Sequence, residues 1–124
     1  MNVAGDNGAR AAWSFGPRAI DPGPIDLSHI SGPVLAFAGD LDNIWGSASS
    51  AHSIILELTV AHSPYRHQAF IYQQAGHGEG MQPYQPAGDT TMANLGGTRA
   101  GNVAAQRDGW PAMLAMLAGL TAKG

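Results

Sequence analysis

Two apolar stretches of this sequence each run into a glycine that is followed by an ionisable side chain. The first reads PVLAFAGDLD and carries Asp40 and Asp42 after its glycine. The second reads IYQQAGH and ends at His77. A carboxylate beside an imidazole can fix the ring tautomer and stabilise the imidazolium that forms when the ring takes a proton from a hydroxyl or thiol. The pattern therefore makes general acid–base chemistry a candidate function.

Each of these residues also has a structural interpretation. An Asp after a glycine is commonly a turn former, and a His after a strand is commonly a surface or hydrogen-bonded loop residue. The pattern alone leaves both interpretations open, as well as the choice between Asp40 and Asp42.

The elements around these residues predict a strand, a helix and a second strand. Residues 34–38 form a short apolar run without alternation, which is typical of a strand buried on both faces of a parallel sheet. Residues 67–73 predict the second strand. Between them, Ser47 or Ser49 is expected to cap a helix that Pro64 breaks. The inward positions of this helix follow a helical period: Ala51, Ile54, Ile55 and Leu58.

A closing helix is predicted after a loop at residues 78–97. Thr98 is its expected N-cap, Gly101 weakens its first turn, and Pro111 should kink it or split it near Asp108. Its expected inner face consists of large apolar side chains: Val103, Trp110, Met113, Leu114, Leu117 and Leu120.

A strand, helix and strand in this order predict an α/β fold in which the two strands are parallel and joined by a right-handed crossover. The carboxyl ends of such strands meet at one edge of the sheet, about 4.8 Å apart. We therefore expect the loops after both strands to bring a carboxylate and His77 into hydrogen-bond range.

From about residue 26 to 120 the chain resembles the C-terminal half of the acyl-CoA thioester hydrolase and bile acid-CoA:amino acid N-acyltransferase family, a branch of the α/β-hydrolases. The matching segments are ISGPVLAFAGDLDNIWGS, AGH, PYQP and GGTRAGNVAAQRDGWPAML. In that family the acid lies in a Gly-x-x-Asp turn followed by Trp and Ser, which here are Trp45 and Ser47. The resemblance thus implies Asp42 as the acid and His77 as the base of a Ser/Cys-His-Asp triad. It also implies a function in acyl-CoA and fatty acid metabolism.

The nucleophile of such a triad is missing from this sequence. Family members carry it on a Gly-x-Ser-x-Gly type of elbow in an earlier strand, and no serine here has a glycine two residues away on both sides. Without nucleophile and oxyanion hole, a triad hydrolase loses on the order of 10⁶-fold in rate. The expectation is a partial α/β-hydrolase domain without its N-terminal half, inactive alone and completed by that half or by another copy. The alternative is a truncated remnant that acts as a non-catalytic binding or assembly module.

The expected domain organisation is an irregular arm at residues 1–32, rich in glycine and proline, followed by the partial domain at residues 33–124. The chain has 124 residues, a net charge of −3 and no cysteine. Such a charge argues against nucleic acid as a partner, and the absence of cysteine excludes disulfides and thiolate metal sites. No signal peptide or membrane span is evident, so cytoplasmic localisation is the default expectation.

Two weaker motifs point to other ligands. His77 and Glu79 have the spacing of a pair of metal ligands, but no third or fourth ligand stands nearby, so neither a metal nor another cofactor is expected. Residues 96–101, with Arg99, could hold an anion at a helix start, although Arg99 is more simply a solvated residue. Trp45 and Trp110 could line an acyl pocket, although core packing is the simpler interpretation. The other histidines are expected to be exposed or locally hydrogen-bonded.

Overall fold

The computed structural model describes residues 25–77 and 95–121, which form two strands and two helices in alternation. In chain order these are strand β1 (Val34–Gly39), helix α2 (Ser47–Val60), strand β2 (His67–Tyr72) and helix α3 (Arg99–Thr121). Residues 1–24 of the predicted arm and residues 78–94 of the predicted loop lie outside the described residues.

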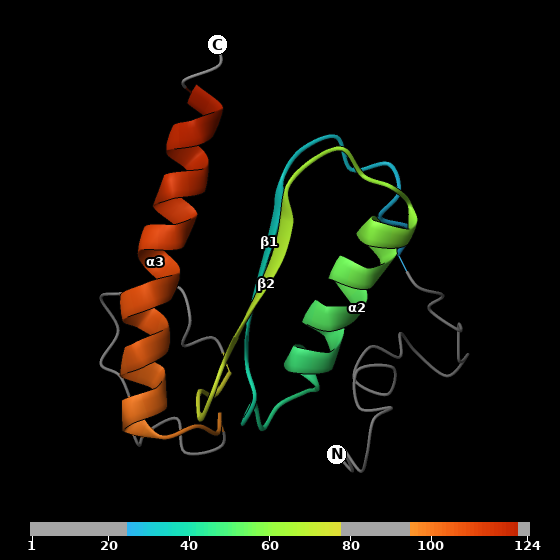
Figure 1. The fold of residues 1–124 in the computed structure, drawn as a ribbon. Coiled ribbons are helices and arrows are strands. Elements are labelled where there is room, and N and C mark those ends of the chain that lie inside the picture. The colour runs from blue at the N-terminus through green and yellow to red at the C-terminus, as the bar shows by residue number, and fades with distance from the viewer. Residues whose placement is uncertain (1–24, 78–94, 122–124) are drawn as a thin grey trace, which may run out of the picture.

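The two strands pair in parallel and in phase, with Val34 opposite His67 and Gly39 opposite Tyr72. Helix α2 lies on one side of this sheet and helix α3 on the other, and both helices begin near the carboxyl ends of the strands (Figure 1). The prediction of an α/β arrangement with parallel strands, a crossover helix and a closing helix is therefore confirmed. The segments that follow β1 and β2 therefore leave the sheet at the same edge.

Helix α2 packs on the sheet through the predicted face. Ala51 and Leu58 are buried, and Ile54 and Ile55 are half-buried. These positions are three to four residues apart, so they form one stripe along the helix.

The residues predicted to begin and end α2 were wrong. The N-cap is Gly46, which makes no side-chain hydrogen bond, and Ser47 is already the first helical residue. The hydroxyl of Ser49 instead bonds back to the Gly46 carbonyl. The helix ends at Val60, ahead of Pro64, because His62 adopts a left-handed conformation with φ 53°.

The predicted inner face of α3 was also wrong. The side of α3 that is buried carries small and polar residues: Gly101, Asn102, Ala105, Gln106 and Gly109. Among the predicted core residues, Trp110 and Met113 are half-buried, whereas Val103, Leu114, Leu117 and Leu120 are 45–50% exposed. The cause is close packing, because a Cβ at Gly101 would collide with the backbone of Gln74. Only small residues allow the start of α3 to lie directly on the segment after β2.

Pro111 does not split α3, which runs as one helix of 23 residues. Proline removes one backbone hydrogen bond and crowds the carbonyl four residues earlier, here that of Arg107. Both Pro111 and Arg107 are exposed, so water can reach the carbonyl that loses its partner. Thr98 caps the helix as predicted, since its hydroxyl accepts the N–H of Gly101 at 3.1 Å.

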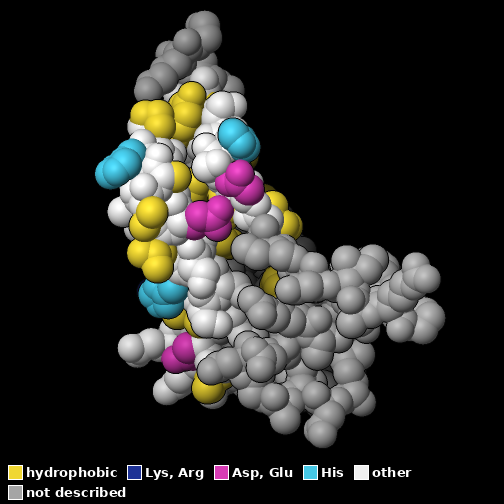
Figure 2. Space-filling model, turned by 90° about the vertical axis from the view of Figure 1, so that its right-hand side faces the viewer, with side chains coloured by type: hydrophobic (Ala, Val, Ile, Leu, Met, Phe, Trp, Pro, Cys, Tyr) yellow, Lys and Arg dark blue, Asp and Glu magenta, His cyan; other side chains and the backbone are white. Residues whose placement is uncertain are grey.

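The outer surface of the molecule on the α2 side carries a mixture of hydrophobic, acidic and histidine side chains (Figure 2). No Lys or Arg side chain is visible among the described residues on this face (Figure 2). Neither helix of the described residues combines the length and apolarity that crossing a bilayer requires.

Candidate active site

The turn after β1 presents Asp42 with both carboxylate oxygens occupied. Oδ1 accepts the backbone N–H groups of Ile44 at 2.9 Å and Trp45 at 3.2 Å, which is an Asx-type turn closed by the side chain. The Asp42 side chain is only 3% exposed. The local turn therefore fixes the direction in which the remaining oxygen, Oδ2, points.

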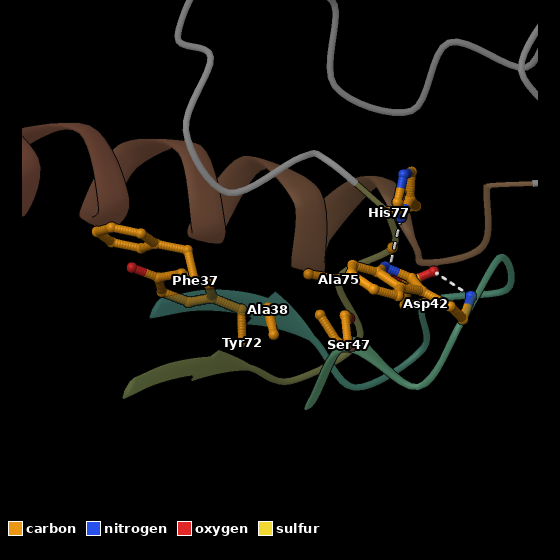
Figure 3. Close-up of a pocket in the computed structure, with 10 residues that line it drawn as sticks. Phe37, Ala38, Asp42, Ser47, Tyr72, Ala75 and His77 are labelled. Carbon is orange, nitrogen blue, oxygen red and sulfur yellow. Dashed lines mark hydrogen bonds and ion pairs between the residues drawn. The ribbon is translucent and has the colours of Figure 1, made fainter. Parts of the chain in front are cut away.

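That oxygen meets the imidazole of His77, whose Nδ1 lies 2.9 Å from Oδ2. An ionised carboxylate can only accept a hydrogen bond, so in the neutral ring Nδ1 carries the proton and Nε2 the lone pair. The His77 ring stands over Asp42 with its other nitrogen turned away from the carboxylate (Figure 3), and its side chain is 37% exposed. The pair thus presents a basic nitrogen outward from a buried acid.

The pKa of Asp42 lies below its usual value although the side chain is buried. Burial by itself raises the pKa, but it is outweighed by hydrogen bonds from the side chains of His77 and Ser47 and from the backbone N–H groups of Ile44 and Trp45. The Ser47 hydroxyl also lies 3.3 Å from the carbonyl of Gly39. Asp42 is therefore held as an anion, which is the form that can orient an imidazole.

Asp40, the other carboxylate after β1, does not meet His77. Its Oδ1 accepts the backbone N–H of Gln74, and Gln74 adopts a left-handed conformation with φ 59°. A non-glycine residue in this region is strained, and the hydrogen bond that the Gln74 N–H donates to Asp40 stabilises this conformation. The structure thus separates the two acids: Asp40 braces the turn after β2, and Asp42 holds the histidine that follows that turn.

A third segment, ahead of α3, joins the acid turn to the histidine. The Leu95 carbonyl accepts the N–H of His77 at 2.8 Å and that of Asn43 at 3.3 Å, and Gly96 forms an antiparallel bridge with Asp42. The sequence analysis missed this role of Leu95. No local signal could have shown it, because a backbone carbonyl acts here through position and not through side-chain type.

Two glycines let these segments approach one another. A Cβ at Gly39 would collide with the backbone of Ala75, and a Cβ at Gly76 would collide with the backbone of Gly96. The glycines that precede the acid and the histidine in the sequence are thus needed for close packing of three chain segments.

A cavity of about 170 Å³ opens beside the pair, lined by both strands and the loops that follow them. Trp45 forms part of its wall and lies edge-on to the His77 ring, with the ring centroids 6.4 Å apart. The simpler interpretation of Trp45 as a core residue was wrong, since it is 36% exposed. Phe37 and Tyr72 line the end of the cavity that is further from His77 (Figure 3). The lining is mostly apolar, which suits an uncharged organic group next to the imidazole.

The remaining predictions concern a metal site, an anion site at the start of α3, and the other histidines. Glu79 lies outside the described residues, among which no three His, Asp or Glu side chains are gathered as metal ligands. At the start of α3, the N–H groups of Gly101 and Asn102 already bond to Thr98, and Arg99 is exposed. His67 bonds locally to Thr59, at 2.9 Å.

A comparison with protein families gives a match over residues 18–122, well over half of the chain. The family is described as BAAT / Acyl-CoA thioester hydrolase C terminal. A search of curated proteins finds no individual protein that matches.

Proposed function

The chain belongs to the BAAT / acyl-CoA thioester hydrolase C-terminal family, and we propose that it supplies the acid and the base of a Ser/Cys-His-Asp triad that cleaves an acyl-CoA thioester. The observation that carries the proposal is the 2.9 Å hydrogen bond from His77 Nδ1 to the buried carboxylate of Asp42. Within the α/β-hydrolase fold proposed for the whole enzyme, this pair lies where loops converge past the strand ends.

In the proposed mechanism, Asp42 holds the His77 ring in the tautomer that leaves Nε2 free. Nε2 takes the proton of a serine or cysteine as that residue attacks the thioester carbonyl, and the anionic Asp42 stabilises the imidazolium that forms. As the tetrahedral intermediate collapses, the carbon–sulfur bond of the thioester breaks and the imidazolium gives its proton to the departing coenzyme A thiolate, which leaves an acyl-enzyme. Water, or an amine in an acyltransferase, then attacks the acyl-enzyme while His77 Nε2 takes its proton, and that proton returns to the serine or cysteine as the acyl group leaves.

The nucleophile in this proposal comes from another polypeptide segment, because the sequence holds no Gly-x-Ser-x-Gly elbow. That segment would be the N-terminal half of the fold, on the same gene or on a partner chain. It would also supply the oxyanion-hole donors, which stabilise the charge that develops on the carbonyl oxygen.

The proposal is tested by incubating the purified chain with palmitoyl-CoA and measuring the release of free thiol, with and without a nucleophile-bearing half. We expect the chain alone to release no thiol above the uncatalysed rate and the completed enzyme to turn over. In the completed enzyme, we expect His77→Ala and Asp42→Ala to lower kcat by roughly 10⁴-fold or more. His52→Ala, an exposed histidine on α2, is the matched control and should leave the rate unchanged.

Three results would contradict the proposal. Thiol release by the chain alone that His77→Ala abolishes would mean that the nucleophile lies within this chain. A completed enzyme that is indifferent to His77→Ala would remove the role of the pair, and a stable complex without turnover would favour the binding-module alternative.

A further inference from the structure

Asn102 is a buried polar side chain that the proposed mechanism does not use. It lies in the first turns of α3 and is 3% exposed. Thr98 already caps this helix through its hydroxyl, so helix capping does not explain the buried amide. Burial of an amide is costly unless its hydrogen bonds are made, so its partners indicate what it does.

The partner of Asn102 is the backbone just before the candidate base. Its Oδ1 accepts the N–H of Gly76 at 2.9 Å, a buried hydrogen bond across 26 residues of sequence. Gly97, in a left-handed conformation with φ 80°, is pressed against this bond, because a Cβ there would collide with both Asn102 Oδ1 and the Gly76 nitrogen. The bond is thus buried and closely packed against the loop that leads into α3.

Two consecutive N–H groups next to the imidazole are therefore fixed by different elements. Gly76 donates to Asn102 of α3, and His77 donates to the Leu95 carbonyl. Together these bonds fix the backbone from which the His77 side chain departs, which leaves only the side-chain torsions for Asp42 to set. A base that is held in this way does not have to be ordered again in each catalytic cycle.

We propose that Asn102 is a positioning residue for His77: through the Gly76 N–H it holds the imidazole in line with Asp42. The inference rests on the proposed function only in calling His77 a base, because the positioning itself can be measured without turnover. It gives a reason for a polar side chain in the buried face of α3.

The test uses the full chain labelled with ¹⁵N and three variants. Asn102→Ala removes the acceptor, Asn102→Asp keeps an acceptor oxygen in the same place, and Gln106→Ala removes another buried amide one turn further along the same face of α3. The readouts are hydrogen exchange of the Gly76 and His77 amides and the tautomer of the His77 ring.

In Asn102→Ala we expect exchange at Gly76 to accelerate at least tenfold and the ring to lose its preference for a proton on Nδ1. Asn102→Asp should keep both properties within about threefold of the parent, and Gln106→Ala should leave them unchanged even where it lowers stability. In a completed enzyme, Asn102→Ala should lower kcat with KM little changed, because the binding surface stays in place.

An unchanged His77 tautomer in folded Asn102→Ala would overturn the inference. If the alanine variant does not fold, the test rests on Asn102→Asp. This variant keeps an acceptor for the Gly76 N–H, so loss of the proton on His77 Nδ1 in it would also overturn the inference. The two proposals can fail separately. If Asn102→Ala changes the Gly76 exchange and the His77 tautomer but the completed enzyme is indifferent to His77→Ala, the positioning role stands and only the proposed function is refuted.

Discussion

Asp40 and Asp42 stand two residues apart after β1, and hydrogen bonding gives them different roles. Asp40 accepts the N–H of Gln74, whereas Asp42 bonds His77 and two N–H groups of its own turn. At the scale of the residue, the useful property of Asp42 is the combination of burial with a lowered pKa. A carboxylate that is buried yet anionic keeps its direction and its charge at neutral pH.

The lowered pKa of Asp42 predicts an acid-sensitive contribution to stability. A folded-state pKa below the unfolded value of 3.8 stabilises the fold above that pH, and the contribution is lost as the pH falls through the folded pKa. We therefore expect Asp42→Asn to be less stable than the parent at pH 6, and the difference to shrink steadily below about pH 4. Urea unfolding followed by circular dichroism at several pH values measures both free energies.

A pair of serine variants serves as a control for this prediction. Ser47→Ala removes one of the groups that lower the pKa of Asp42 and should show a weaker form of the same pH dependence. Ser53→Ala, on the exposed side of α2, should show none. A constant difference between parent and Asp42→Asn from pH 6 to pH 3 would contradict the assignment.

At the scale of the element, α3 is a helix whose sequence looks interrupted and whose structure is continuous. It holds Gly101, Gly109, Pro111 and Gly119 within its 23 residues. Gly101 is required by close packing on Gln74, whereas a Cβ at Gly119 would meet nothing within 4 Å. One glycine of this helix is thus needed for close packing and another is not, and only the three-dimensional structure distinguishes them.

Replacement of Pro111 should stabilise the protein. Pro111→Ala restores the missing N–H on an exposed side of α3, so we expect the free energy of unfolding to rise by about 1–3 kcal/mol. Gly119→Ala is the reference and should add at most about 1 kcal/mol, since it only reduces the freedom of the unfolded chain. Thermal unfolding measures both, and a loss of stability in Pro111→Ala would mean that its ring makes packing contacts.

Across the whole molecule, the core of the described residues is small and is divided between the two faces of the sheet, with Ala51 and Leu58 on α2 and Ala105 on α3. Leu58 is the largest side chain that is less than 2% exposed, and the other buried hydrophobic residues are alanines. The second half of α3 carries Leu114, Leu117 and Leu120 about half exposed. The two helices therefore contribute very differently to stability.

Two leucine variants measure this asymmetry. Leu58→Ala should cost about 2–5 kcal/mol, because it leaves a cavity in a close-packed site. Leu117→Ala should cost less than about 1 kcal/mol, because its side chain is already 46% exposed and alanine favours the helix. Equal costs in urea unfolding would mean that the second half of α3 packs against further parts of the chain.

The order of the elements, the parallel strand pair and the stripe of α2 that packs on the sheet could all be predicted from the sequence. The sequence also placed His77 and the two acids just past the strand ends. These features follow from short-range patterns, in which apolar runs form strands, helical spacing forms a stripe, and connection order sets strand direction. The motifs quoted for the family resemblance are local in the same sense.

Which side chains meet could be seen only in the folded chain. The Leu95 carbonyl that joins the acid turn to the histidine, the Asn102 amide under Gly76 and the buried face of α3 depend on contacts between segments far apart in sequence. The period of a helix tells which side chains share a face, but it does not tell which face a neighbour will cover. In α3 the face with small and polar residues is the buried one, because only small side chains let the helix lie directly on the segment after β2. The shape of that segment, and not the sequence of the helix, therefore sets which face is buried.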